Sequence, residues 1–260
     1  MLQEERYEKI LSILSEKKHV TIEQIQKTLQ ISLSTVRRDF RTLVERDLAI
    51  RSRGGISCRT VNRENDYFPF ELRRITHVKE KEKLAHAAAS LLNPNDTFFI
   101  DGGTTTLHLV RCLPNYPLTA VTNSLPHVSA MIENHFRNAH LEIYSAGGMV
   151  YAPWKVNLGP QARYCLSQYH AQYAFLSCRG IDASGTYNHN ELVVETERTM
   201  MANADKVVFI VDHSKIGTRA MSFLCDLDEI DILITSKRSA DLEIIKTFQE
   251  HSMEIMFVNE

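Results

Sequence analysis

Apolar residues in the first 45 positions recur at the three- and four-residue spacing of amphipathic helices. A first helix is predicted over roughly 3–16, and its apolar positions are Leu2, Tyr7, Ile10, Leu11 and Leu14. Thr21 and Gln24 have the spacing of a capping box, so a short second helix is expected to begin there. Ser32 is placed to cap a third helix, whose apolar positions are Val36, Phe40, Leu43 and Val44.

The opposite face of the third helix is polar and cationic, and it carries Ser34, Thr35, Arg37, Arg38 and Arg41. A short helix, a tight turn and a helix of this kind are typical of a helix-turn-helix. Arginine pairs with guanine edges and phosphates, and hydroxyls reach phosphate oxygens. We therefore expect this helix to enter the major groove of DNA, the alternative being a solvated charged face. Asp39, inside the run, is expected to pair with a neighbouring Arg or Lys.

The segment after Asp47 alternates short apolar positions with a glycine pair. Leu48, Ile50 and Ile56 predict two short strands, and Gly54-Gly55 a positive-φ turn between them. Arg51 and Arg53 flank the turn and are expected to contact the DNA backbone. Residues 1–57 are thus predicted to form a winged helix.

Residues 58–80 have little helical periodicity until their end and predict a linker. Its apolar cluster is Tyr67, Phe68 and Phe70, which we expect to dock on one domain, a loose tether being the alternative. A charged stretch at 79–83 then starts a helix that leads into the second domain.

Apolar bursts alternate with helical patterns over residues 81–260, which predicts an α/β domain with a mainly parallel sheet. The candidate strands are Thr97–Ile100, Leu118–Thr122, Leu141–Tyr144, Tyr173–Ser177, Val207–Val211, Ile232–Ile234 and Glu254–Phe257. Ligands of such sheets bind at the carboxyl ends of the strands, so the loops there are where a site is expected.

Those loops are rich in glycine and hydroxyl groups. The first strand is followed by Asp101, Gly102, Gly103, Thr104, Thr105 and Thr106, a turn that opens a helix. Backbone N–H groups and hydroxyls at a helix start favour an anion. The Gly-Lys-Ser/Thr of a nucleotide P-loop is missing, so a single phosphate fits better than a nucleoside triphosphate. Later strands end at Asn123, at Gly147-Gly148, at Asp182 and at Lys215, which supports a site for a phosphorylated small molecule.

The net charge of −2 conceals two regions of opposite sign. Residues 1–60 hold 12 Lys/Arg and 8 Asp/Glu, and the remainder hold 18 and 24. A basic first region is expected next to a polyanion. No apolar run of membrane-spanning length or signal-peptide character is present, and the five scattered cysteines are expected to be reduced in the cytoplasm. Neither a metal site nor a cofactor is expected, because the eleven histidines show no ligand spacing.

The runs Arg6–Ile10 and Ser32–Asp39 resemble those of the DeoR family of bacterial sugar-metabolism regulators, and Ser-x-x-Thr-Val-Arg-Arg-Asp is its specific signature. The resemblance covers nearly the whole chain. It implies a winged helix-turn-helix followed by an effector domain similar to ribose-5-phosphate isomerase and glucosamine-6-phosphate deaminase. In that resemblance the loop after the first strand holds the phosphate, with Lys215 close to it. Glu197 falls where the isomerase keeps its catalytic carboxylate and Asp182 on another acidic position, whereas Arg179 replaces an acid.

The predicted function is a DNA-binding regulator, a repressor of a carbohydrate-utilisation operon that responds to a phosphorylated sugar. One winged helix contacts too few bases to specify a unique DNA site, so a homo-oligomer, a dimer or tetramer, is expected. The alternative is a sugar-phosphate isomerase or deaminase with an accessory DNA-binding head, supported by Asp182, Glu197 and Lys215 and weakened by Arg179.

Overall fold

A computed structural model describes residues 3–46, 48–58, 70–135, 138–239 and 243–259. The chain divides into two compact units, Met1–Val78 and Lys79–Glu260. Among the described residues, no helix is both long enough and apolar enough to cross a membrane.

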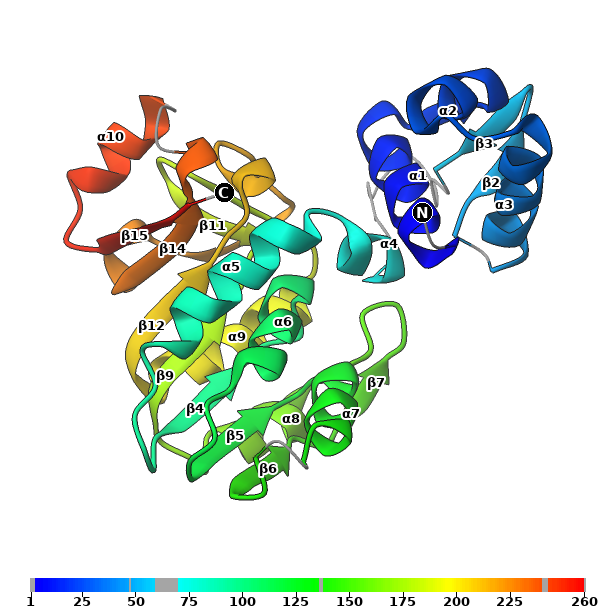
Figure 1. Ribbon diagram of the computed structural model, residues 1–260. Helices are drawn as coiled ribbons and strands as arrows, with labels where there is room; N and C mark the ends of the chain where they lie inside the picture. The colour runs from blue at the N-terminus through cyan, green and yellow to red at the C-terminus, as the bar shows by residue number, and fades with distance from the viewer. Residues whose placement is uncertain (1–2, 47, 59–69, 136–137, 240–242, 260) are drawn as a thin grey trace. The chain divides into compact units, whose positions relative to one another are not determined.

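The first unit is a helix-turn-helix closed by a small sheet (Figure 1). Its elements are α1 (Gln3–Lys17), β1 (His19–Thr21), α2 (Ile22–Leu29), α3 (Leu33–Glu45), β2 (Ile50–Ser52), β3 (Gly55–Ser57) and α4 (Phe70–Ile75). The predicted capping box of Thr21 and Gln24 is present, and Ser32 caps α3. The sheet is antiparallel in the order β1-β3-β2, so the two predicted wing strands gain a third, which the sequence analysis did not anticipate.

Apolar side chains of α1, α2, α3 and the sheet form one core in this unit, including Ile10, Leu14, Ile25, Leu43 and Ile56, each at most 1% exposed. Helix α4 lies in the segment predicted as a linker and packs against α1. Phe70 at its start is buried, and Tyr67 and Phe68 lie outside the described residues.

The second unit is built on a seven-stranded parallel sheet (Figure 1). In spatial order the strands are β15 (Glu254–Val258), β14 (Ile232–Ser236), β12 (Ala204–Ile210), β9 (Ala171–Leu176), β4 (Thr97–Ile100), β5 (Leu118–Thr122) and β6 (Leu141–Ser145). All seven predicted strands are present, displaced by at most three residues at an end. The predicted α/β class with a parallel sheet is confirmed.

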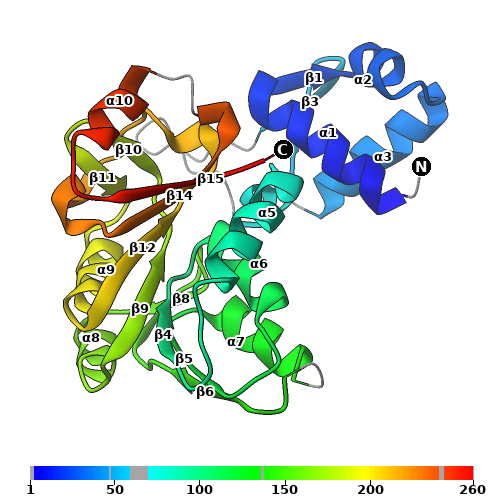
Figure 2. The same ribbon diagram turned by 60° about the vertical axis from the view of Figure 1, so that its left-hand side comes forward.

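Helices cover both faces of this sheet, as Figure 2 shows. One face carries α5 (Val78–Ala89), α6 (Thr104–Cys112) and α7 (Leu125–Glu133); the other carries α8 (Pro160–Leu166), α9 (Glu191–Ala202) and α10 (Glu243–Gln249). Successive residues of β4 alternate between the two layers, since Phe98 and Ile100 pack in one and Phe99 in the other. Burial on both sides explains why these strands read as continuous apolar runs.

Two smaller sheets stand beside the main one, and they escaped the sequence analysis. The first is the hairpin of β7 (Met149–Tyr151) and β8 (Val156–Leu158). The second is antiparallel, in the order β10 (Gly180–Asp182), β11 (Gly185–Asn188) and β13 (Ser222–Cys225). Short helical turns η1 (His213–Lys215), η2 (Leu227–Glu229) and η3 (Lys237–Ser239) complete the unit. Strands of three or four residues carry too little alternation to be recognised from the chain.

Candidate DNA-binding face and effector site

Helix α3 buries one side and exposes a cationic side. Val36, Phe40 and Leu43 are buried, whereas Ser34, Arg37, Arg38 and Arg41 are exposed and share one face at i, i+3, i+4 and i+7 spacing. Thr35 is half-buried beneath them, with its hydroxyl 2.8 Å from that of Ser32. No described residue takes a hydrogen bond or ion pair from the three arginines, so their guanidinium groups remain available to an external anion.

The wing presents Arg51 and Arg53 to solvent at the turn between β2 and β3. Gly54 has φ +76°, as the predicted turn requires, but Gly55 does not lie in the positive-φ region. A Cβ on Gly55 would lie 1.9 Å from the carbonyl oxygen of Val20, so this glycine is needed for close strand packing. The two glycines therefore serve different purposes, one in the turn and one in the sheet.

Asp39 is completely buried on the inner side of α3, and its partner is Arg6 of α1. Arg6 Nε donates to Oδ2 at 2.7 Å, and the second contact joins Nη2 to Oδ1 at 3.0 Å. The expected ion pair exists, but it joins residues 33 positions apart and not neighbours in the cationic run. This two-point contact holds α1 against the recognition helix.

In the second unit, the loop after β4 turns sharply into α6. Gly103 is the N-cap, and among described residues no side chain caps this helix. A Cβ on Gly102 would lie 2.3 Å from Val156 Cγ1, and one on Gly103 1.9 Å from Ser177 Oγ. Both glycines are thus required by packing inside the protein, while the first-turn N–H groups keep the positive end of the helix dipole uncapped.

Lys81 is a site residue that the sequence analysis missed. It lies on α5, is 3% exposed, and donates from Nζ to Thr104 Oγ1 at 3.3 Å. It occupies the apolar stripe of that helix together with Leu84, Ala85 and Ala88. A lysine at a buried helical position was the available signal, because burying an ammonium group is costly unless it has a partner.

Thr106 begins a chain of buried polar groups that ends at Ser124. Its hydroxyl donates to Asp101 Oδ1 at 2.6 Å and lies 3.2 Å from His127 Nε2, and His127 Nδ1 lies 2.7 Å from Ser124 Oγ. Because the other neighbours of the Thr106 oxygen are acceptors, Nε2 carries the hydrogen and Nδ1 accepts from Ser124. Burial lowers the pKa of His127 to about 3, so its ring is neutral.

Asp101 and Glu197 are two buried carboxyls of the same site. Asp101 accepts hydrogen bonds from Gly103 N, Thr106 and Ser177, yet burial raises its pKa above the usual value. Burial also raises the pKa of Glu197 well above its usual range, the charge of Asp101 adds to this rise, and the amide of Asn188 opposes it. The negative charge of one carboxyl thus disfavours ionisation of the other.

Lys215 is brought into the same region. Burial raises the pKa of the Cys178 thiol, the ammonium group of Lys215 opposes that rise, and Glu197 and Asp212 add to it. These effects place the ammonium group of Lys215 and the carboxyl of Glu197 within electrostatic reach of the Cys178 thiol, just after the carboxyl end of β9.

The β7–β8 hairpin joins the ends of β5 and β6. Asn157 N donates to the main-chain oxygen of Asn123 at 2.7 Å, and Asn157 Nδ2 donates to Ala146 O at 2.7 Å. Asn123 Nδ2 donates to Asn157 O at 3.0 Å, while its Oδ1 is buried with no partner among the described residues. Gly148 has φ +133° and a Cβ there would meet Leu158 O at 2.7 Å, whereas Gly147 has open space around its Cα.

Asp182 lies in a different setting. Its carboxylate contacts Arg219 and accepts from Ser184 N at 2.8 Å and from Tyr187 Oη at 3.2 Å. Burial alone would raise its pKa, but these contacts, that of Arg219 foremost, lower it below the usual value. Its partners all belong to the small antiparallel sheet or the segment before β13.

Arg179 donates from Nε to His189 Nε2 at 2.9 Å. The ring of His189 packs edge-on against Trp154, with centroids 6.1 Å apart. His189 is therefore a half-buried packing partner.

Comparisons with known proteins cover both units. The DeoR-like helix-turn-helix domain matches residues 6–61, and the DeoR C terminal sensor domain matches residues 76–237. The HTH-type transcriptional regulator UlaR of Shigella sonnei is 31% identical over 99% of this chain and 100% of its own, and the regulator YulB of Bacillus subtilis is 29% identical over 99% and 98%. A solved ribose 5-phosphate isomerase A from Methanocaldococcus jannaschii covers 54% of this chain and 55% of its own at 15% identity, with a TM-score of 0.38.

The two domain matches account for most of the chain and occur in the order that the structure shows. The relatives of similar length are regulators of transcription and not enzymes. The chain belongs to the DeoR family of helix-turn-helix transcriptional regulators.

Proposed function

We propose that this regulator represses a carbohydrate-utilisation operon by reading its operator with α3 and the wing. Ser34, Thr35, Arg37, Arg38 and Arg41 contact DNA in and beside the major groove, and Arg51 and Arg53 contact the flanking phosphates. The observation that supports this half is the row of exposed arginines on α3, to which no described residue offers a partner.

The effector is a sugar or related metabolite with one phosphate, bound at the Asp101–Thr106 loop. The observation that carries this half is Lys81, which is buried against Thr104 at a helix start that has no side-chain cap. An ammonium group and free N–H groups at one point form an anion site. Lys215 contributes a second cation from the neighbouring loop.

The part of the effector other than the phosphate faces hydrogen-bond acceptors and carboxyl groups, in contrast to the cations and N–H groups that face the phosphate. Asn123 Oδ1 is a buried acceptor without a partner among the described residues, and an unsatisfied group of this kind costs about 1–3 kcal/mol. A sugar hydroxyl would satisfy it. The carboxyls of Glu197 and Asp101, whose pKa values burial raises, can hydrogen-bond to sugar oxygens, and the open space at Gly147 leaves the end of β6 accessible to the ligand. Asp182 is bonded to Arg219, so its carboxylate acts on the site only by holding the segment that leads from Lys215 to Arg219.

Family membership argues against the isomerase alternative, and the structure supports the same view at one position. Arg179 is engaged with His189, where a proton-transferring acid would be needed. The retained carboxyls then serve recognition, with no turnover expected.

The regulator acts as a homo-oligomer in the cytoplasm, where its operator lies. The exposed face of a single α3 reaches only a few base pairs, so specific binding needs repeated half-sites read by two or more heads. A dimer is the smallest such assembly, and a tetramer would read two operators.

A thermal-shift titration of the full chain tests the effector site. Ribose 5-phosphate, glucose 6-phosphate, fructose 6-phosphate and inorganic phosphate are compared with the corresponding unphosphorylated sugars. We expect stabilisation by phosphorylated compounds alone. Thr105→Asp, which puts a carboxylate at the start of α6, should abolish the shift and leave operator binding intact, because it repels the phosphate.

Thr105→Ser is the matched control and should respond like the wild type, since it keeps the hydroxyl. If Thr105→Asp keeps the full shift, the phosphate does not bind at this loop.

A further inference from the structure

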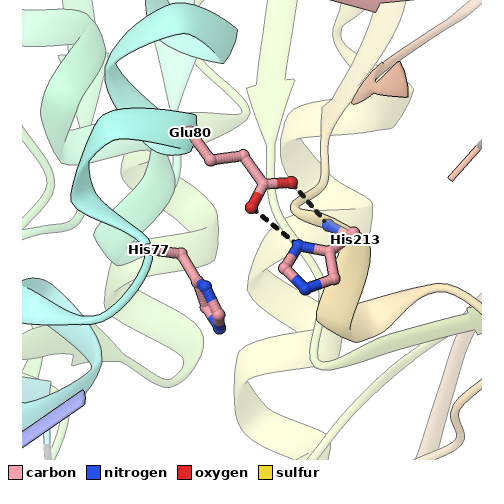
Figure 3. A group of neighbouring side chains, drawn as sticks. All are labelled: His77, Glu80 and His213. Carbon is pink, nitrogen blue, oxygen red and sulfur yellow. Dashed lines mark hydrogen bonds and ion pairs between the residues drawn. The ribbon is translucent and has the colours of Figure 1, made fainter. Parts of the chain in front are cut away.

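Glu80, in the first turn of α5, contacts the turn η1 and the last residue of β14, both far away in the sequence. Its Oε1 accepts from the main-chain N of His213 at 2.9 Å and from Ser236 Oγ at 2.7 Å. Its Oε2 lies 2.7 Å from His213 Nδ1, and Figure 3 shows the carboxylate facing both groups of that residue. The side chain is 10% exposed, so these contacts are shielded from water.

His213 is the first residue of η1, the turn that carries Lys215. The Asp212 side chain fixes this turn from within by accepting from Ser214 N at 3.1 Å, and Glu80 fixes it from outside. A lysine side chain is flexible, and its ammonium group can be aimed only if its backbone is held. Glu80 is therefore part of what places Lys215.

The next residue of α5, Lys81, contacts Thr104 at the start of α6. Two successive residues of one helical turn thus reach the two loops that carry the cations and N–H groups of the proposed phosphate site. The same turn lies at the beginning of the second unit, directly after the chain leaves the DNA-binding unit at Val78. Hydrogen bonds of Glu80 and Lys81 thus join both loops to this turn.

We propose that Glu80 is a positioning residue that couples occupancy of the phosphate site to α5 and, through it, to operator affinity. The inference rests on the proposed function. An effector changes DNA affinity only if it distinguishes two states of the protein. An anion that draws Lys215 towards the start of α6 moves η1, and the three contacts of Glu80 carry that movement to α5.

The test compares full-length wild type, Glu80→Gln and Glu82→Gln. Glu82 lies on the same helix with an exposed side chain, so its variant makes the same chemical change without the contacts. Operator duplexes selected from a random pool are titrated with and without saturating phosphorylated sugar, and inorganic phosphate serves as the simplest anion. Binding of the same probes to the DNA-free protein is measured by calorimetry.

In the wild type and in Glu82→Gln we expect the probe to weaken operator binding by about 5–150-fold, the usual range of allosteric coupling. Glu80→Gln should still bind the probe, within about tenfold of the wild-type affinity, while the weakening falls below about threefold. A role confined to stability would lower the melting temperature without changing this ratio.

Three results would overturn the coupling. If Glu80→Gln responds like the wild type, the proposed function stands and Glu80 does not couple the sites. If Glu80→Gln no longer binds any probe, Glu80 serves binding and not transmission. If the wild type responds to no phosphate compound, the proposed effector site itself is wrong, and the coupling falls with it.

Discussion

The two candidate sites of this protein use charge in opposite ways. On α3 the arginines are exposed and have no partner among described residues, so their guanidinium groups are solvated and accessible to a ligand. At the sensor site the charged and polar groups are buried and bonded to one another, as with Asp101, Glu197 and His127. The first surface can bind a polyanion without reorganising, whereas the second must exchange internal contacts for contacts to its ligand.

This difference decides what each site discriminates. Exposed cations attract any nucleic acid, and sequence is then read by the few that reach base edges. Buried groups in a low-dielectric setting reject ligands that leave them unpaired, so a small site can be selective. The head is suited to a large ligand and the sensor domain to a small one.

The largest effect is expected from a substitution at Asp39, the buried carboxylate of the DNA-binding unit. Asp39→Ala removes the carboxylate that Arg6 contacts at two points, and breaking such a buried pair costs about 3–5 kcal/mol of unfolding free energy. Urea unfolding of the full chain measures the loss. Trp154, the single tryptophan, lies in the second unit, so its fluorescence should be unchanged while the circular dichroism transition of the head moves to lower urea.

The control is Asp205→Ala, which removes the exposed pair with His170 and should cost under about 0.5 kcal/mol. Equal losses in both variants would mean that the Arg6–Asp39 pair is no more important than a surface pair.

A smaller effect is expected on the exposed side of α3. Arg37→Ala or Arg38→Ala should weaken operator binding by about 1–3 kcal/mol if the residue contacts a base edge, with specificity relaxed at one position. Arg51→Ala in the wing should weaken all sequences alike and lower the salt dependence by about one charge. Fluorescence anisotropy over a range of salt separates the two cases, with exposed Lys206→Ala as control. Unchanged affinity in both α3 variants would mean that another face reads the DNA.

The smallest expected effect concerns the second unit and is the pH dependence of its unfolding free energy. The folded state holds the pKa of His127 at about 3, below its ordinary 6.5, so the unfolded chain binds the extra proton between these values. Stability from this group is complete above pH 6.5 and is lost as the pH falls towards 3, at slightly under ~1.4 kcal/mol per pH unit. His127→Gln should remove that slope.

Trp154 fluorescence in urea at pH 6 and pH 5 measures the difference between wild type and variant. The raised pKa values of Asp101 and Glu197 act with the opposite sign in both proteins, so the comparison isolates His127. Parallel curves for the two proteins would show that His127 titrates normally in the fold.

The inner strands β4, β5 and β14 were predictable because they are largely buried on both sides and read as apolar runs, whereas the edge strands β6 and β15 are more exposed. The residues on the face of α3 were predictable because an exposed helix shows its chemistry at local spacing. The partner of Asp39 was not, since Arg6 is 33 residues away and only the packing of α1 on α3 joins them.

The sensor site shows the same limit. Its glycines and threonines announce a loop, but the contacts of Lys81, His127 and Glu80 depend on how α5 and α7 lie over the sheet. The reason why Gly102 and Gly103 must be glycines could not be predicted either, because the atoms with which a Cβ would clash belong to the distant residues Val156 and Ser177.

Thr21 ends β1 and also caps α2, while the next residue, Ile22, donates its N–H to Gly54 O in the wing turn at 3.1 Å. The wing therefore cannot slide along the sheet without uncapping a helix of the reading motif. Each head then has a footprint on DNA of fixed length. In the proposed oligomer the effector would then change the distance between two such footprints, and the spacing between half-sites in the operator would be the quantity on which regulation acts.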